Sequence, residues 1–401
     1  MPDHPSASPR PAAARPRNAA ATRRPSRRAR GTGTAWRGWL AGLLAPVLVP
    51  VLGLALAPVL GLALAPVLGL ALAPAAAAEA CAGEDLLDRL AREDPAAHAA
   101  ILAEGAAIPN GDARLWRIAI PGTDTPASHL FGTYHDTETL ATLTPAVETA
   151  FAAATRLVVE LDAAEVAAMQ DRIAADPAFS LRADPVVPGE GLADRLDAAG
   201  RAAADRALAR RGLSLALADR LAPWLLFSAL GVPACELAAM AEGEVVMDRG
   251  LMDRAEARGI PVTGLESYES ALATFDALPD AAVADLLADS IALAEIEEDL
   301  RATMIGLYAE GRIGVLAATA TAVTRRRSAR AGPEAERLEA LFHDLVLAKR
   351  NDAWLEHLEP LLAEGGAFVA VGALHLPDTD GLVAGLRARG FHLTPVPETP
   401  P

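Results

Sequence analysis

Short apolar runs alternate with longer amphipathic stretches along most of this chain. The run 367–372 is apolar at nearly every position, which favours a buried strand, whereas 145–154, 247–258 and 381–389 have a helical pattern. Strands alternating with helices predict an α/β fold, with a central mixed β-sheet flanked by helices. A mostly helical stretch near 281–345 predicts a helical insertion or cap. The predicted strands are 114–120, 128–132, 156–161, 261–265, 367–372 and 391–396.

The stretch 38–78 differs from the rest because it contains no charged side chain. Its eight-residue unit APVLGLAL occurs at 57–64 and again at 65–72. Residues 1–37 carry nine Arg and one acidic residue, and we expect them to be a disordered, positively charged n-region. The combination predicts a signal peptide or membrane anchor in front of a single domain at 79–401.

Cleavage and anchoring both remain open for this apolar stretch. Small residues at 76–78 and at 78–80 fit the A-x-A cleavage rule, but about 20 apolar residues also suffice to span a bilayer. Either outcome places the domain in the periplasm or on the outer face of the inner membrane of a bacterium. The two cysteines, Cys81 and Cys235, then predict a disulfide, because exported chains with an even cysteine count tend to pair them.

The net charge of the predicted domain limits the kinds of molecule that it could bind. From Glu79 onward the chain has 27 basic and 51 acidic residues, a balance of −24. A domain this acidic repels phosphates, so we expect no nucleic-acid partner. Lysine occurs once, at Lys349, which argues against catalysis through a lysine adduct.

Two matched motifs carry the candidate chemistry. Gly132-Thr133-Tyr134-His135 and Gly372-Ala373-Leu374-His375 each follow an apolar strand and deliver a histidine three residues after a glycine. Sites in open α/β sheets gather beyond the carboxyl ends of strands, so His135 and His375 are predicted to share one cleft. The alternative is that each histidine only caps a strand at the surface.

Carboxylates and an arginine accompany the histidines. Glu160 lies within one predicted strand and Glu266 ends another, and a buried carboxylate needs a partner. Arg350 and Asn351, on a predicted helix, are candidate partners. Glu160 and Glu266 are therefore either metal ligands or general bases, or they are members of a structural ion pair.

These pieces resemble the TraB/PrgY/GumN family, whose animal relatives include the Tiki membrane proteases. The similar segments are LFGTYH (130–135), VVELD (158–162), CELAAMAEGEVVMDRGLMDRA (235–255), PVTGLES (261–267), KRNDAW (349–354) and VAVGALHLPDTDGL (369–382). Asp136 departs from the family pattern, where an apolar residue is expected, and Ser267 stands in place of Thr.

The resemblance implies a metal-dependent hydrolase, possibly a peptidase, of the bacterial cell envelope. The equivalent positions in this sequence are His135, Glu160, Glu266, Arg350, Asn351 and His375. Two histidines with a carboxylate suit Zn²⁺, Mn²⁺ or Co²⁺, so His135, His375 and Glu160 are the expected ligands. The expected substrate is an unidentified peptide or small molecule.

Two alternative functions stay open. The first is a non-catalytic accessory or binding protein of the envelope, in which the His, Glu and Arg residues form a structural network. The second is a metal-free hydrolase that uses His135 as its base.

Overall fold

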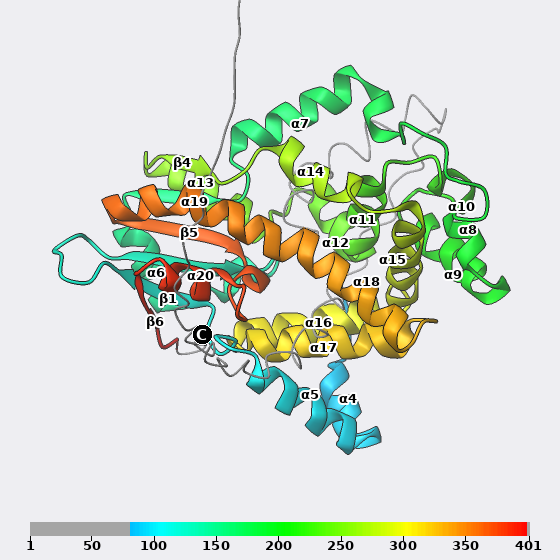
Figure 1. Cartoon of the computed structure of the whole chain (residues 1–401), viewed down its shortest axis with the longest axis horizontal. Coiled ribbons are helices and arrows are strands. Elements are labelled where there is room, and N and C mark those ends of the chain that lie inside the picture. Colours follow the sequence, from blue (N-terminus) through cyan, green and yellow to red (C-terminus); the bar gives the residue numbers. More distant parts are fainter. Residues whose placement is uncertain (1–80, 399–401) are drawn as a thin grey trace, which may run out of the picture. The chain divides into compact units, whose positions relative to one another are not determined.

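The computed structural model describes residues 81–398 and contains one six-stranded sheet (Figure 1). The strand order is β4-β3-β5-β2-β1-β6. The predicted n-region at 1–37 and apolar stretch at 38–78 lie outside the described residues. The strands are β1 (Leu115–Ala119), β2 (Ser128–Thr133), β3 (Arg156–Val159), β4 (Val262–Gly264), β5 (Ala367–Gly372) and β6 (His392–Pro395).

The direction of the strands decides where the candidate site lies. β2, β5, β3 and β4 are consecutive neighbours and pair in parallel. β1 is antiparallel to both β2 and β6, so the sheet is mixed, as predicted. The four parallel strands therefore present their carboxyl ends at one edge, which is where the sequence motifs are located.

Helices cover both faces of the sheet, as buried parallel strands require. Alternate residues of one strand enter different cores. Phe368 of β5 packs with the larger helical body, whereas Val369 packs with Trp354 of α19 and Leu382 of α20. Figure 1 shows α19 lying along the sheet beside β5.

The helical part of the protein is larger than the predicted insertion at 281–345. The helices between β3 and β4 pack into the same hydrophobic core as those of 281–345. The longer helices are α4 (Leu86–Glu93), α5 (Pro95–Ala107), α6 (Pro145–Ala153), α7 (Ala163–Ala175), α9 (Ala198–Ala209), α11 (Pro223–Gly231), α12 (Ala234–Ala241), α13 (Met247–Ala257), α14 (Tyr268–Asp276), α15 (Asp280–Leu293), α16 (Glu297–Ala309), α17 (Ile313–Arg327), α18 (Pro333–His343), α19 (Lys349–Glu364) and α20 (Leu382–Ala388). Short helices are α8 (Leu192–Arg195) and α10 (Leu215–Ala218).

No single helix within residues 81–398 is long and apolar enough to cross a membrane, although the pair α11 and α12, bent by 94°, passes that test by length and composition when taken together.

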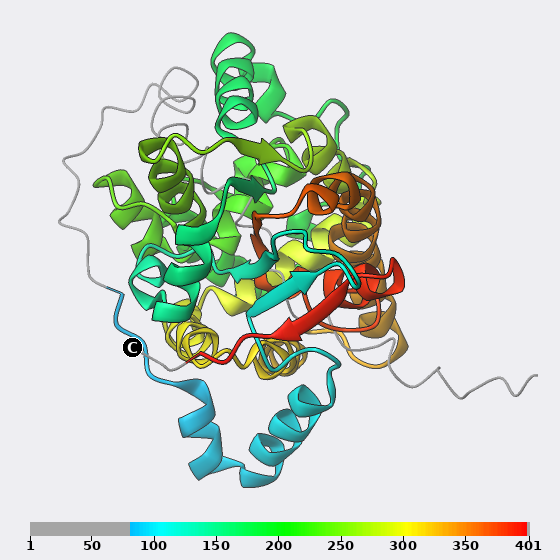
Figure 2. The same ribbon diagram turned by 90° about the vertical axis from the view of Figure 1, so that its left-hand side faces the viewer.

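The first helices are fastened to the body by covalent and close contacts. A disulfide joins Cys81 to Cys235 with a Cα–Cα distance of 5.4 Å, which confirms the predicted pairing. Behind it, α5 crosses α17 at Gly105, where an added Cβ would lie 2.4 Å from the Val315 Cα. Figures 1 and 2 show α4 and α5 together at one end, beside α16 and α17.

Candidate functional site

The two Gly-x-x-His motifs end neighbouring parallel strands, β2 and β5, whose register pairs Thr133 with Gly372. Both imidazoles turn toward Gly372. A Cβ placed on Gly372 would lie 3.5 Å from His375 Cδ2 and 3.8 Å from His135 Nε2. The sum of these distances is an upper limit on the separation of the two atoms, and it is below the roughly 10 Å that excludes a shared ligand site. The two imidazoles therefore converge as predicted, although in the described part of the chain only His135 of the two lines a cleft.

Arg350, in the first turn of α19, holds both candidate carboxylates. Its Nη2 donates to Glu160 Oε2 at 2.8 Å and also bonds Glu266 Oε1. Its Nε lies 3.2 Å from Glu266 Oε1. The opposite oxygen of Glu160, Oε1, accepts the backbone N–H of Gly372 at 2.7 Å. The ion pair anticipated from the sequence is thus present, and it lies directly against the histidines.

His375 is fixed in one orientation by Asn351. The Asn351 amide donates to the Asp380 carbonyl at 3.0 Å, so its oxygen faces the ring and accepts the Nδ1–H of His375 at 2.7 Å. Burial and the nearby Arg350 guanidinium hold the pKa of His375 well below its usual range. The ring is therefore neutral near pH 7, and its unprotonated Nε2 lies 3.5 Å from Arg350 Nη1.

His135 is held by a residue that sequence reasoning did not single out, Asp248 in the first turn of α13. Asp248 Oδ2 lies 2.7 Å from His135 Nδ1, and Oδ1 accepts the hydroxyl of Thr133 at 2.9 Å. His135 Nε2 is buried and has no hydrogen-bond partner among residues 81–398. Asp248 lies inside the family-like segment 235–255, which was the available signal for it.

Burial dominates the electrostatics of the cluster. It raises the pKa of the Glu160 carboxyl, although Arg350 and His135 oppose the shift. Burial alone would lower the pKa of Arg350, but Glu266 and Glu160 more than offset this and raise it. The charged side chains of the cluster thus lie in a buried environment of low dielectric constant. The Trp354 ring packs against one side of it, with its centroid 4.4 Å from that of the His375 ring.

The helix that carries Arg350 is preceded by an irregular turn of the backbone. A π-helical turn, Asp344–Ala348, connects α18 to α19 directly before Arg350. Such turns are rare within helices and often occur at functional sites.

A family model for the TraB/PrgY/gumN family matches residues 114–395. The chain belongs to the TraB/PrgY/gumN family. The match starts just before β1 and ends with β6, so it includes the whole sheet and every candidate site residue. Searches of curated proteins and of solved structures each returned no match.

The two departures from the family pattern both have a local explanation. Asp136 is buried and accepts two hydrogen bonds from Arg301, at 2.6 and 2.8 Å. Arg301 also pairs with Glu236 at 2.6 Å, and the Thr137 backbone donates to Glu236 at 3.0 Å. Burial and the charge of Glu236 raise the pKa of Asp136 to about 6. Ser267 caps α14 by accepting the N–H of Ser270, and Thr is also a favoured residue at this position.

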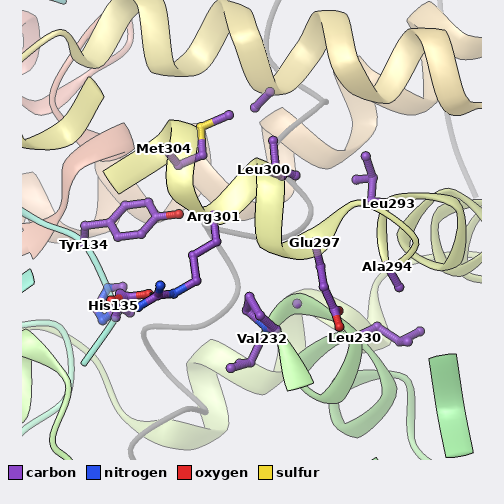
Figure 3. Close-up of a pocket in the computed structure, with 14 residues that line it drawn as sticks. Tyr134, His135, Leu230, Val232, Leu293, Ala294, Glu297, Leu300, Arg301 and Met304 are labelled. Carbon is purple, nitrogen blue, oxygen red and sulfur yellow. Dashed lines mark hydrogen bonds and ion pairs between the residues drawn. The ribbon is translucent and has the colours of Figure 1, made fainter. Parts of the chain in front are cut away.

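A cleft opens on the side of His135 that faces the helical body (Figure 3). It encloses about 40 Å³, enough for a few water molecules. Its walls are mainly apolar, with Leu230, Val232 and Met304 among them, and Arg301 reaches toward His135. Water and a small apolar group could therefore approach this imidazole.

The residues of this TraB/PrgY/gumN chain fit a divalent cation in part. The partnerless Nε2 of His135 and the unprotonated Nε2 of His375 are the donor atoms that such a cation takes from histidine. Asn351 hydrogen-bonds Nδ1 of His375, and the Asp248 carboxylate lies 2.7 Å from Nδ1 of His135; outer contacts of this kind usually orient metal-binding histidines. Glu160, however, is engaged by Arg350, and within residues 81–398 no three His, Cys, Asp or Glu side chains form a group ready to hold a metal.

Proposed function

We propose that this protein is a metal-dependent hydrolase in which His135 and His375 hold a divalent cation through their Nε2 atoms. The observation that supports this most directly is the paired anchoring of the histidines. Each Nδ1 faces an oxygen, of Asp248 or of Asn351. Nε2 of His135 has no hydrogen-bond partner within residues 81–398, and Nε2 of His375 faces Arg350 Nη1 at 3.5 Å. Glu160, whose Oε1 would lie 3.2 Å from a Cβ placed on Gly372, would be the third ligand.

The remaining residues position and stabilise charge. A bound Zn²⁺, Mn²⁺ or Co²⁺ would lower the pKa of a water molecule and polarise a carbonyl. Arg350 holds Glu160 and Glu266 in place and provides a guanidinium for negative charge that develops on the substrate. The carboxylate of Glu266, which is hydrogen-bonded by Arg350, would serve as the proton acceptor. We propose a peptide or small molecule with an apolar group as substrate, because the cleft beside His135 is mainly apolar.

One observation favours a second candidate, a metal-free hydrolase. An aspartate at Nδ1 of a histidine with a free Nε2 is also the arrangement of a general base and its orienting carboxylate. In this case His135 accepts the proton of a water molecule from the cleft, and Asp248 stabilises the imidazolium.

Elemental analysis of the exported chain, followed by a peptide-library screen with and without a chelator, distinguishes the two candidates. We expect bound metal in the wild type and in H392A, whose histidine is exposed on β6, and its loss from H135A and H375A. Chelation should abolish hydrolysis if the cation is required. Hydrolysis that survives chelation but is lost in D248N would support the metal-free base. A chain without metal and without activity would support a structural network instead.

We propose further that the domain acts outside the cytoplasm, either released or anchored by its apolar stretch. The Cys81–Cys235 disulfide supports this, since such bonds persist in oxidising compartments. Replacing Leu60, Leu62 and Leu64 with Arg should block export, at about 2.5–3.5 kcal/mol per charge on insertion scales. A fused phosphatase reporter that stays active in this variant would contradict the proposal.

A further inference from the structure

A second and larger cavity lies away from the histidine cluster, between the α4–α5 pair and the α16–α17 pair. It encloses about 510 Å³, within the size range of small-molecule sites. Its deep wall is aliphatic: Leu86, Leu87 and Ile101 are buried there, and Leu90 and Val323 line it as well. The one hydroxyl among the buried lining residues, on Thr319, donates to the Val315 carbonyl. The deep wall therefore offers a ligand apolar contacts without unmet hydrogen bonds.

The mouth of the cavity has the opposite character. Arg89, Arg326 and Arg327 line it, and their side chains are partly or fully exposed. Arg89 pairs with Asp299 and Arg326 with Asp94, both at 3.0 Å. Within residues 81–398 no carboxylate lies within ion-pair distance of Arg327.

Carboxylates are present at this mouth too, namely Glu93 and Asp299. With Asp94, the partner of Arg326, these make three carboxylates against three guanidinium groups, of which Arg89 and Arg326 are already paired. The cation that remains for an anionic ligand is Arg327, which has no ion pair within residues 81–398.

We propose that this cavity binds a single-chain fatty acid, with the alkyl chain against the aliphatic wall and the carboxylate at Arg327. The gradient from aliphatic depth to cationic mouth matches an amphiphile with one anionic end. Guanidinium groups bind carboxylates in a planar, two-point geometry, which suits Arg327 because it has no competing ion pair within the described chain. The site is independent of the histidine cluster, so it stands whether or not the protein is a hydrolase.

Photo-crosslinking of the full-length chain with a diazirine-bearing palmitate analogue tests this inference. We expect saturable labelling of peptides from α4, α5 and α17, displaced by unlabelled palmitate. Each shortening of the competitor by two methylenes should raise the concentration needed about tenfold. Hexadecanol, which lacks the charge, should compete at least tenfold less well than palmitate.

Two variants localise the ligand. V323W fills the aliphatic wall, and R326Q/R327Q removes the cationic mouth; each should reduce labelling of α4 and α17 tenfold or more. The matched control is R206Q/R249Q, which removes two exposed arginines elsewhere and should label as the wild type does. If V323W does not fold, the arginine pair decides alone. Labelling that is non-saturable, that lies outside these helices, or that is equal in R326Q/R327Q and its control would overturn the proposal.

Discussion

Removing the guanidinium of Arg350 is expected to cost about 3–5 kcal/mol of the free energy of unfolding, the usual loss when one partner of a buried ion pair is deleted. In R350M the carboxylates of Glu160 and Glu266 would remain buried without their countercharge. Both side chains are at most 6% exposed, so water cannot replace the lost partner. The methionine stem retains much of the packing against Trp354, which leaves charge as the main change.

The loss of unfolding free energy in R350M should depend on pH. The direction of this dependence follows from the raised pKa of Glu160. A carboxyl group whose pKa is higher in the folded than in the unfolded state favours folding below the unfolded value of about 4.3. That contribution disappears as the pH rises through the folded value. Without Arg350 the pKa of Glu160 rises further. The destabilisation of R350M should therefore be smallest near pH 4 and grow toward pH 8.

Urea unfolding at several pH values measures both effects through the transition midpoint, at constant m-value. The control is R156M, which removes a pair with the largely exposed Glu364 and should cost at most about 1 kcal/mol. Neutralising the carboxylates as well, in R350M/E160Q/E266Q, should recover part of the loss. A cost no larger than that of R156M, or one independent of pH, would refute this account of the network.

Three further outcomes are expected. D248N should weaken Zn²⁺ or Mn²⁺ binding 10–100-fold in calorimetric titration, because the carboxylate no longer orients His135; unchanged affinity would speak against that role. Replacing Cys81 and Cys235 with serine should lower the free energy of unfolding by about 3–5 kcal/mol in urea, and reductant should affect the wild type alone. Because the pKa of Asp136 is raised to about 6, the wild type should lose about 2 kcal/mol relative to D136N between pH 4 and pH 7, and parallel pH profiles would contradict this.

The sheet could be predicted because its strands are short, apolar and bounded by glycine or proline. The run 367–372 coincides with β5, and 128–132 and 156–161 overlap β2 and β3. The convergence of the histidines followed from the same pattern, since parallel strands end at one edge. The order of the strands did not follow, because it depends on pairings between segments far apart in the chain, such as β5 between β2 and β3.

The outer contacts of the site were also beyond sequence reasoning. Asp248 reaches His135 across 113 positions of the chain, and Arg301 reaches Asp136 across 165. Neither residue stands in a pattern that names its partner. Asp136 gave a usable hint, because a charge at an expected apolar position calls for a buried countercharge, but the sequence offered many arginines and no means of choosing Arg301.

The charge of the completed cluster links its structural and its proposed catalytic interpretations. Glu160, Glu266 and Asp248 carry three formal negative charges, and Arg350 carries one positive charge. Counted without the imidazoles, two negative charges remain in a buried site. Such an excess is costly in a low-dielectric interior and must be compensated by protons or by a cation. Protonation is consistent with the raised pKa of Glu160, and a divalent cation at His135 and His375 would neutralise the same excess while leaving every carboxylate ionised. The network that stabilises the sheet edge therefore leaves an excess of negative charge that either protons or a divalent ion would neutralise.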